Sequence, residues 1–387
     1  MLLTKGENLM KALVLEDVKK FELRDVPKPV VGEKDVLIRI GAVGICGTDL
    51  HIFLGLANYN RDSRGQAIPL KQSPQILGHE FCGTVESVGN EVTKVRPGDR
   101  VVVDQLLNCW SQERSPQCEY CETGDSHECE FGNQLGITGP PGAFADYIAV
   151  PAVNVVPLPP TMTDLEAAII EPLACVIHAS DRMESANNRY TFSGKHKIRH
   201  ILILGAGPSG LLFVQYLRNV RKFDGEIFIA DMRESKLNVA KKLGATPLDV
   251  RHVDLITEIQ TRTNGGRLQY VIEATGSGPV FDWIPSVVRP QATVLLYGGG
   301  HSGRDIGCLT PFQVLENVLV TSGGASGGFE ADGTPTIYKL SMEYLRDGKF
   351  DAASLISHRY STLTQLPRAF GEDATQQDFI KGVLVKE

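Results

Sequence analysis

The chain lacks several features that would indicate a membrane, an export route or a nucleic acid. None of its apolar runs approaches the roughly 20 residues that a membrane-spanning helix requires. Residues 1–11 contain no sustained apolar stretch, which argues against a signal peptide. The formal net charge is -7 and no segment concentrates lysine and arginine, so a nucleic-acid partner is not expected. The sequence therefore predicts a cytoplasmic protein.

Cysteine is scarce outside one segment. The chain has 8 cysteines, and those between positions 109 and 129 are Cys109, Cys118, Cys121 and Cys129. The others are Cys46, Cys82, Cys175 and Cys308. In a long chain without an export signal, such a cluster indicates a metal site rather than a disulfide framework.

The length of 387 residues predicts two domains, and the sequence pattern changes near residue 199. Before this point, short valine-rich runs alternate with turn signals such as residues 96–99, which predicts a compact β-barrel domain with long loops. The proline-rich residues 157–160 end the last strand of this part. Residues 163–166 form a capping box, which predicts a helix that continues to about Arg182.

From residue 199 onward, strand-like apolar runs alternate with helical segments. Strands are expected at 201–204, 226–230, 270–274 and 293–297, and helices at 209–220 and 235–243. Such alternation predicts a parallel sheet with right-handed crossovers. The alternation of strand-like and helical segments ends beyond about Phe312. The predicted fold class is therefore α/β, with a doubly wound parallel sheet that follows a β-rich domain.

A glycine motif directly follows the first of these predicted strands. The motif has the form G-x-G-x-x-G and consists of Gly205, Ala206, Gly207, Pro208, Ser209 and Gly210. Between a strand and a helix, this motif predicts dinucleotide binding. Its first glycine allows the tight turn, its second lets the backbone approach the pyrophosphate, and its third allows close helix packing.

The end of the next predicted strand bears on the choice of dinucleotide. Asp231 lies 21 residues after Gly210, at the spacing of an acid that binds the ribose hydroxyls. Its charge would repel a 2′-phosphate, which favours NAD over NADP. Arg233 could instead partner that phosphate, so NADP stays an alternative. Thr275 and Gly276, after the predicted strand at 270–274, are further expected cofactor contacts.

Two short segments of the first domain combine three metal-binding groups. Residues 46–51 read Cys-Gly-Thr-Asp-Leu-His, and residues 78–80 read Gly-His-Glu. A thiol, an imidazole and a carboxylate suit a borderline-soft metal, zinc above all. Taken alone, Cys46 would more often be a small buried apolar residue, and His79 a core histidine. A Lewis-acid metal together with a hydride carrier suits redox chemistry between alcohols and carbonyls.

These motifs also carry a family resemblance. Residues 78–92 follow the pattern G-H-E-x2-G-x5-G-x2-V, and together with residues 46–51 they resemble the zinc-dependent medium-chain dehydrogenases. This family includes alcohol, sorbitol, glucose and threonine dehydrogenases. The resemblance covers nearly the whole chain from Met10. It implies a GroES-like β-barrel catalytic domain at 1–172 and 313–387, with a Rossmann NAD-binding domain at 173–312.

The resemblance also implies roles for individual residues. Cys46 and His79 would be zinc ligands, with Glu80 or Glu171 as the third. Glu171 stands where classical alcohol dehydrogenases of the family have a cysteine. One carboxylate could bind directly and the other through water, and the interpretation favoured here has Glu80 as the direct ligand. Thr48 and His51 match the proton-relay positions, although His51 could also be an ordinary surface histidine.

The cysteine cluster resembles the structural zinc lobe of the family, expected at about residues 104–132. Cys118, Cys121 and Cys129 match its last three ligands, whereas Ser115 stands at the usual first position. Cys109 is the expected replacement, with residues 111–116 as an insertion. The alternative is an empty lobe with free thiols.

The implied activity is zinc-dependent hydride transfer between NAD and a secondary alcohol, in a homodimer or homotetramer. Residues 171–173 are typical of enzymes for a polyol, sugar or inositol-like substrate. Residues 44–54 and 139–147 are more similar to L-threonine 3-dehydrogenases, so an amino alcohol is the alternative substrate. A zinc-free reductase or a binding protein on the same fold would lack the cysteine, histidine and acid that this chain retains.

Overall fold

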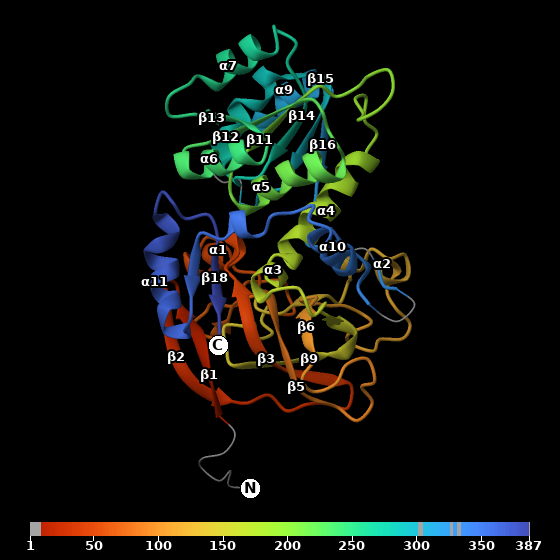
Figure 1. Cartoon of the computed structure of the whole chain (residues 1–387), viewed down its shortest axis with the longest axis vertical. Helices are drawn as coiled ribbons and strands as arrows, with labels where there is room; N and C mark the ends of the chain where they lie inside the picture. Colours follow the sequence, from red (N-terminus) through yellow and green to blue (C-terminus); the bar gives the residue numbers. More distant parts are fainter. Residues whose placement is uncertain (1–8, 301–304, 326–327, 331–333, 387) are drawn as a thin grey trace. The chain divides into compact units, whose positions relative to one another are not determined.

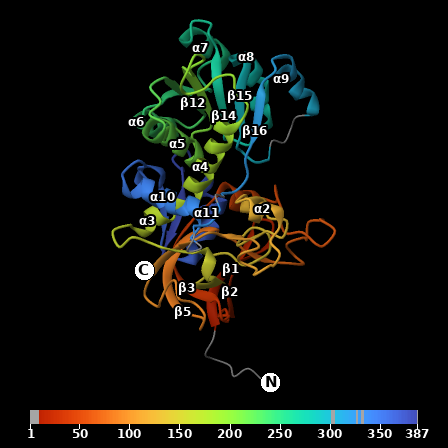
Figure 2. The ribbon, with the colours of Figure 1, turned by 90° about the vertical axis from the view of Figure 1, so that its right-hand side faces the viewer.

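The computed structural model describes residues 9–300, 305–325, 328–330 and 334–386 (Figures 1 and 2). The chain divides into two units. The first unit comprises Met1–Ala174, Ser326–Arg346 and Ile356–Glu387, and the second comprises Cys175–Ala325 and Asp347–Leu355. Across the described ranges, no helix has the length and apolar character to cross a membrane.

The first unit is built on a seven-stranded sheet with β3 at its centre. The strand order is β10-β6-β5-β3-β18-β17, and β9 also pairs with β3. The strands of this sheet are β3 (Asp35–Gly44), β5 (Glu80–Val88), β6 (Arg100–Val103), β9 (Tyr147–Pro151), β10 (Val155–Pro157), β17 (His358–Tyr360) and β18 (Gly382–Val385). Because β18 lies next to β3, the C-terminal segment completes a sheet that the first half of the chain began.

Smaller sheets and short helices complete the first unit. One sheet has the order β2-β1-β4, and β7 pairs with β8. These strands are β1 (Leu9–Asp17), β2 (Lys20–Pro27), β4 (Gln75–Ile76), β7 (Leu106–Leu107) and β8 (Asn133–Gln134). The helices are α1 (Gly47–Phe53), α2 (Glu119–Glu122), α3 (Asp164–Ala167), α10 (Thr336–Arg346) and α11 (Leu366–Gly371). The larger apolar core of this unit joins the strands to α1 and α11, including Leu13, Ile38, Val43, Phe53, Phe81, Phe144 and Phe370.

The predicted helix from residue 163 to about Arg182 is instead two helices. The capping box is present, since the Glu166 N–H donates to Thr163 Oγ1 at 3.2 Å. Helix α3 nevertheless stops after Ala167, and α4 (Ile170–Ser185) starts afresh. Pro172 supplies the reason: it has no N–H, and in a continuous helix its ring would clash with the carbonyl four residues earlier. As a first-turn residue of α4, Pro172 is well tolerated.

The second unit is a six-stranded parallel sheet in the order β13-β12-β11-β14-β15-β16. Its strands are β11 (His200–Leu204), β12 (Glu226–Asp231), β13 (Thr246–Asp249), β14 (Leu268–Glu273), β15 (Val288–Leu296) and β16 (Val318–Thr321). Its helices are α5 (Pro208–Gln215), α6 (Glu234–Lys242), α7 (Leu255–Arg262), α8 (Ile284–Val287) and α9 (Thr310–Val314). This strand order is that of a doubly wound dinucleotide-binding fold, which confirms the predicted fold class.

Apolar side chains bury the sheet of the second unit. Residues of α7, α8 and α9 pack with the strands in one cluster, which includes Leu202, Phe228, Ile259, Val271, Ile284 and Phe312. Helices α5 and α6 lie on the other side of the sheet (Figure 2). The predicted helix at 209–220 is α5 followed by a π-helical turn, Tyr216–Val220.

Two strands of this sheet lie outside the pattern expected from the sequence. The sixth strand, β16, follows residue 312, where the sequence placed the end of the domain, and it pairs in parallel with β15 through Thr293 and Val318. Strand β13 contains Pro247, a residue that weakens a strand prediction. Both are edge strands only four residues long, and tertiary pairing decides their conformation.

Candidate metal and cofactor sites

Cys46, His79 and Glu80 converge at one buried point because β3 and β5 are neighbours. The antiparallel register pairs Gly44 with Glu80, so the chain that leaves β3 passes the beginning of β5. One ligand atom from each of the three residues lies within 4.8 Å of the other two. His79 is 2% exposed and Glu80 is 1% exposed. A half-buried thiol together with a buried imidazole and a buried carboxylate at this spacing fits a zinc ion.

Asp49 holds this arrangement together from the first turn of α1. Its carboxylate accepts the N–H of Cys46 at 2.9 Å and that of Gly78 at 3.2 Å. The same carboxylate lies 3.3 Å from Nδ1 of His79. Burial by itself would lower the pKa of His79, but the charges of Asp49 and Cys46 raise it well above its usual value. A carboxylate beside Nδ1 leaves Nε2 to face the metal, as is usual for zinc-binding histidines.

Lys381 is a member of this site that sequence reasoning missed. Its Nζ donates to Glu80 Oε2 at 2.5 Å and to the carbonyl of Ile45 at 3.3 Å. Both Lys381 and Glu80 are 1% exposed. Burial would lower the pKa of Lys381, but the charges of Glu80 and Cys46 raise it, so its ammonium group is charged. Lys381 precedes β18 directly, and only the pairing of β18 with β3 brings it to the site.

Glu171 occupies a separate buried position on the first turn of α4. It is 5% exposed, and its Oε1 accepts a hydrogen bond from Gln105 Nε2 at 3.1 Å. Among the described residues, Glu171 does not belong to the group whose ligand atoms lie within 4.8 Å of one another. Asp104 is buried nearby, and burial together with the charge of Glu171 raises its pKa to about 7. The sequence left open whether Glu80 or Glu171 is the third ligand. In the structure, Glu80 belongs to the group of close ligand atoms and Glu171 does not.

Thr48 and His51 share helix α1 with Asp49, and α1 starts directly after Cys46. Because they are three residues apart, they lie on the same side of the helix. Both side chains are half-buried. Burial lowers the pKa of His51, so its imidazole is neutral near pH 7 and can take up a proton.

Four cysteine sulfurs form a second group in the first unit that could hold a metal ion. The ligand atoms of Cys109, Cys118, Cys121 and Cys129 lie within 4.8 Å of one another. Cys129 Sγ is 3.6 Å from that of Cys109 and 3.8 Å from that of Cys118. Thiolates around a tetrahedral zinc ion are separated by about 3.8 Å, given a Zn–S distance of about 2.3 Å. In the structure, Cys109 is therefore the fourth cysteine of this group, the position at which the sequence pattern has Ser115.

The environment of Cys118 favours a thiolate. Burial opposes ionisation, but the backbone N–H groups of Cys121 and Glu130 lower the pKa of Cys118 to about 6. All four cysteines are free thiols in the structure. Burial instead raises the pKa of Cys121 and of Cys129. The fit of these four sulfurs to zinc thus rests on their spacing.

In the second unit, the glycine motif forms the turn between β11 and α5. Gly205 has a φ of 98°, a left-handed conformation that favours glycine. A side chain on Gly210 would overlap the carbonyl oxygen of Gly205, whereas Gly207 has open space around its Cα. Gly207 is the N-cap of α5 and Pro208 its first residue, with Ser209 next. This free helix N-terminus is suited to bind a pyrophosphate.

Asp231 ends β12 beside this turn, as the sequence predicts. One carboxylate oxygen accepts the N–H of Ala206 at 2.8 Å. The other accepts the N–H groups of Met232 at 2.7 Å and Arg233 at 2.9 Å. These bonds fix the orientation of the carboxylate. Since each oxygen has two lone pairs, the Ala206-bonded oxygen can also accept a ribose hydroxyl.

Glu273, which sequence reasoning missed, orders the loop that contains Thr275 and Gly276. Its side chain is fully buried at the end of β14. Its Oε1 accepts the N–H of Thr275 at 2.6 Å and that of Gly276 at 3.1 Å. A methyl group on Gly205 would lie 2.9 Å from Thr275 Cγ2. The loop of Thr275 and Gly276 therefore borders the glycine turn.

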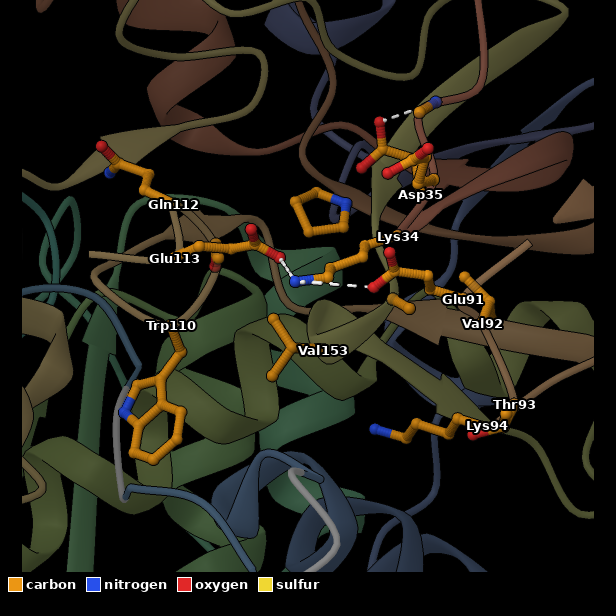
Figure 3. A pocket seen from close by; sticks show the side chains of 15 residues that line it. Lys34, Asp35, Glu91, Val92, Thr93, Lys94, Trp110, Gln112, Glu113 and Val153 are labelled. Carbon is orange, nitrogen blue, oxygen red and sulfur yellow. Dashed lines mark hydrogen bonds and ion pairs between the residues drawn. The ribbon is translucent and has the colours of Figure 1, made fainter. Parts of the chain in front are cut away.

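A surface hollow of about 660 Å³ in the first unit belongs to neither metal group (Figure 3). None of the predicted site residues lines it. Near its middle, Lys34 Nζ lies 2.6 Å from Glu113 and 3.7 Å from Glu91. Because these charges pair with one another, we assign no ligand to the hollow.

Comparison with known families matches both units. The family described as "Alcohol dehydrogenase GroES-like domain" matches residues 32–160. The family described as "Zinc-binding dehydrogenase" matches residues 208–332. Together with the two groups of possible metal ligands, these matches define a zinc-binding dehydrogenase.

Individual relatives are similar over most of their length. Sorbitol dehydrogenase of Bacillus subtilis (strain 168) is 30% identical over 355 residues, which cover 91% of this chain and 90% of the relative. L-threonine 3-dehydrogenase of Streptomyces coelicolor is 33% identical over 355 residues, which cover 91% and 93%. A solved alcohol dehydrogenase from E. coli CFT073, complexed with NADH, superimposes with a TM-score of 0.79 at 23% identity, over 98% of this chain and all of that one. The chain belongs to the zinc-dependent medium-chain dehydrogenase family.

Proposed function

We propose that this chain transfers hydride between NAD and a secondary alcohol of a polyol, sugar or inositol-like substrate. The observation that carries the proposal is that Cys46, His79 and Glu80 place one ligand atom each within 4.8 Å of the others, in a chain that also has a doubly wound parallel sheet. Three protein ligands leave one position of a tetrahedral zinc open, as a catalytic site requires. The sorbitol dehydrogenase relative supports a polyol substrate.

The residues of the first unit have distinct roles in this proposal. Cys46, His79 and Glu80 hold the metal, and Asp49 orients His79 by its position beside Nδ1. When bound, zinc supplies a Lewis acid that polarises the substrate oxygen. Lys381 keeps the Glu80 carboxylate in one orientation through its hydrogen bond.

In this proposal, Thr48 and His51 of α1 transfer the proton. The Thr48 hydroxyl can accept a hydrogen bond from the substrate hydroxyl and donate its own to the next acceptor. His51 can then carry the proton outward, because its lowered pKa keeps the imidazole neutral near pH 7. The Thr48 and His51 roles follow from their positions on one side of α1, close in sequence to Cys46.

The second unit binds the cofactor in this proposal. The N-terminus of α5, with Gly207, receives the pyrophosphate, and the Asp231 carboxylate accepts the ribose hydroxyls. Asp231 would repel a 2′-phosphate, which favours NAD. Arg233, directly before α6, is the residue through which NADP could be accommodated. When bound, the nicotinamide supplies the hydride acceptor.

L-threonine is the second candidate substrate. The Streptomyces coelicolor L-threonine 3-dehydrogenase, at 33% identity, is as similar to this chain as the sorbitol dehydrogenase at 30%. Both substrates are secondary alcohols, so the same metal, relay and cofactor residues serve either one.

The proposal is tested by a screen of NAD reduction over polyols, aldoses, inositols, L-threonine and simple alcohols. Zinc is measured in the same preparation. About two zinc ions per chain and activity with a polyol or sugar are expected. Activity with L-threonine alone would favour the second candidate, and absence of zinc would refute both. Size-exclusion chromatography with light scattering tests the expected dimer or tetramer.

A further inference from the structure

Arginines collect at the edge of the second unit's sheet where its parallel strands begin. Strands β11, β14 and β15 are neighbours in this sheet. Arg199 directly precedes β11, Arg267 directly precedes β14, and Arg289 is the second residue of β15. The side-chain oxygen of Gln269 in β14 accepts the N–H groups of Arg199 and His200, each at 2.9 Å. Because neighbouring parallel strands begin at the same edge of a sheet, the three arginines stand on one border of the unit.

Tyr190 holds two arginine side chains at the same edge. The guanidinium carbon of Arg189 lies 6.0 Å from the centre of the Tyr190 ring, and that of Arg289 lies 5.6 Å from it. The ring is buried, and its hydroxyl donates to a carbonyl of β15 at 3.3 Å. Arg189 also donates to Gln291 Oε1 at 3.1 Å. These contacts restrain both guanidinium groups. We call Arg189, Arg199, Arg267 and Arg289 the arginine edge.

The arginine edge keeps its positive charge. In the part of the chain that the structure describes, none of its four side chains forms an ion pair with an acid. Acids of the adjoining segments have other partners: Asp224 pairs with Lys197 at 3.0 Å, Glu226 accepts a threonine hydroxyl, and Glu316 accepts a glutamine amide at 2.9 Å. A locally positive surface thus exists on a chain whose formal net charge is -7.

The first unit carries a surface of the opposite sign on its cysteine cluster. Five exposed acids lie between positions 119 and 130, and no lysine or arginine stands between positions 115 and 135. We call these acids the acidic lobe: Glu119, Glu122, Asp125, Glu128 and Glu130. Across the described ranges, none of the five pairs with a lysine or an arginine. Four thiolates around one divalent ion would add further net negative charge.

The two surfaces match in chemistry as well as in sign. A guanidinium group presents its N–H donors in a planar fork that fits a carboxylate with two parallel hydrogen bonds. Both surfaces are restrained, one by strand ends and by Tyr190, the other by the short segments that bring the cysteine sulfurs together. Restrained groups lose little conformational entropy when they bind. A nucleic acid suits the arginine edge less well, because a chain of net charge -7 repels a long polyanion.

We propose that the arginine edge of one copy of this chain docks on the acidic lobe of a second copy. Each chain carries both surfaces, so the contact either forms twice within a closed pair or repeats from copy to copy. The inference goes beyond the proposed function, since it concerns assembly and requires no particular substrate. It also names residues that would hold together the oligomer expected from the sequence.

The experiment measures the mass of the zinc-loaded protein by light scattering and sedimentation as salt and protein concentration vary. Exposed charge pairs weaken as salt screens them. The unmodified protein should therefore associate at about 50 mM NaCl and dissociate, at least in part, at about 500 mM. The variant Arg199→Glu with Arg289→Glu places like charges opposite the acidic lobe. Its salt-sensitive association should be at least about 10-fold weaker.

Charge exchange tests the identity of the docked surface. The variant Glu119→Lys with Glu122→Lys should by itself show the same loss of association. A mixture of the two variants restores opposite charges across the contact and should restore association. The matched control is Arg64→Glu with Arg96→Glu, which makes the same change in net charge at two exposed arginines of the first unit. It should associate as the unmodified protein does.

The outcomes separate this inference from the proposed function. Unchanged mass and salt dependence in Arg199→Glu with Arg289→Glu would overturn the docking contact, as would failure of the mixed variants to associate. Retardation of a single-stranded oligonucleotide by the unmodified protein alone, with masses unchanged, would make a nucleic acid the occupant and the proposal wrong. Zinc content, NAD-dependent activity and urea unfolding are measured in every variant. Loss of association with these three quantities retained supports docking and leaves the proposed function untouched.

Discussion

Replacement of Lys381 by Met removes the cation paired with Glu80 and keeps a side chain of similar length. Both partners are 1% exposed, so the metal-free variant retains a buried carboxylate without its cation. Removing one partner of a buried ion pair costs about 3–5 kcal/mol of folding free energy. We therefore expect the metal-free Lys381→Met protein to be destabilised by about 4 kcal/mol relative to the unmodified one.

Zinc should offset part of this loss because it gives Glu80 another cation. If the zinc-loaded variant loses only about 2 kcal/mol, the thermodynamic cycle requires its zinc affinity to rise by the difference of about 2 kcal/mol. At about 1.4 kcal/mol per factor of ten, this corresponds to a roughly 30-fold increase. Lys381 would then compete with the metal for Glu80 in the unmodified protein.

The assay is urea unfolding of both proteins with and without zinc, together with zinc titration against a chelator. Lys386→Met is the matched control, since Lys386 pairs with Asp146 at a partly exposed position. That variant should lose no more than about 1 kcal/mol, equally in both metal states. Equal destabilisation of Lys381→Met with and without zinc, or a lower zinc affinity in that variant, would refute the reasoning.

Four further predictions follow from the two metal groups and the cofactor turn. Cys46→Ser should lose one zinc and most activity while the fold persists, because a weakly acidic hydroxyl replaces a thiolate; near-normal turnover would contradict this. Cys118→Ala should lose the other zinc and lower Tm while the metal at Cys46 stays bound, so undiminished zinc content would exclude a four-cysteine site. Asp231→Ala should shift the ratio of kcat/KM values towards NADP, and an unchanged ratio would count against the ribose acid. Glu80→Gln should weaken zinc binding whereas Glu171→Gln should mainly lower kcat; chelator competition showing the reverse order would make Glu171 the ligand.

Local order along the chain determined much of what the sequence could predict. The spacing of Gly205, Gly210 and Asp231 is a property of one strand, one turn and the next strand, so this turn and the acid beside it could be predicted from the sequence. The α/β class followed from the alternation of strands and helices, and the structure and the family comparisons confirm it. Cys46 and the His79–Glu80 pair were recognisable because each stands in a short motif.

Only the tertiary structure showed which side chains from distant parts of the chain lie next to these residues. Lys381 is 301 positions from Glu80 in the chain, and Tyr338, whose hydroxyl donates to Gln105, is 233 positions from it. No local pattern marks such residues, because their roles arise from the pairing of β18 with β3 and from the burial of α10. The same holds for the short edge strands β13 and β16, whose conformation depends on a neighbouring strand. The sequence thus determined the residues that stand in short motifs, because each motif is a local feature of the chain. Long-range packing decided which charged and amide side chains surround those motifs.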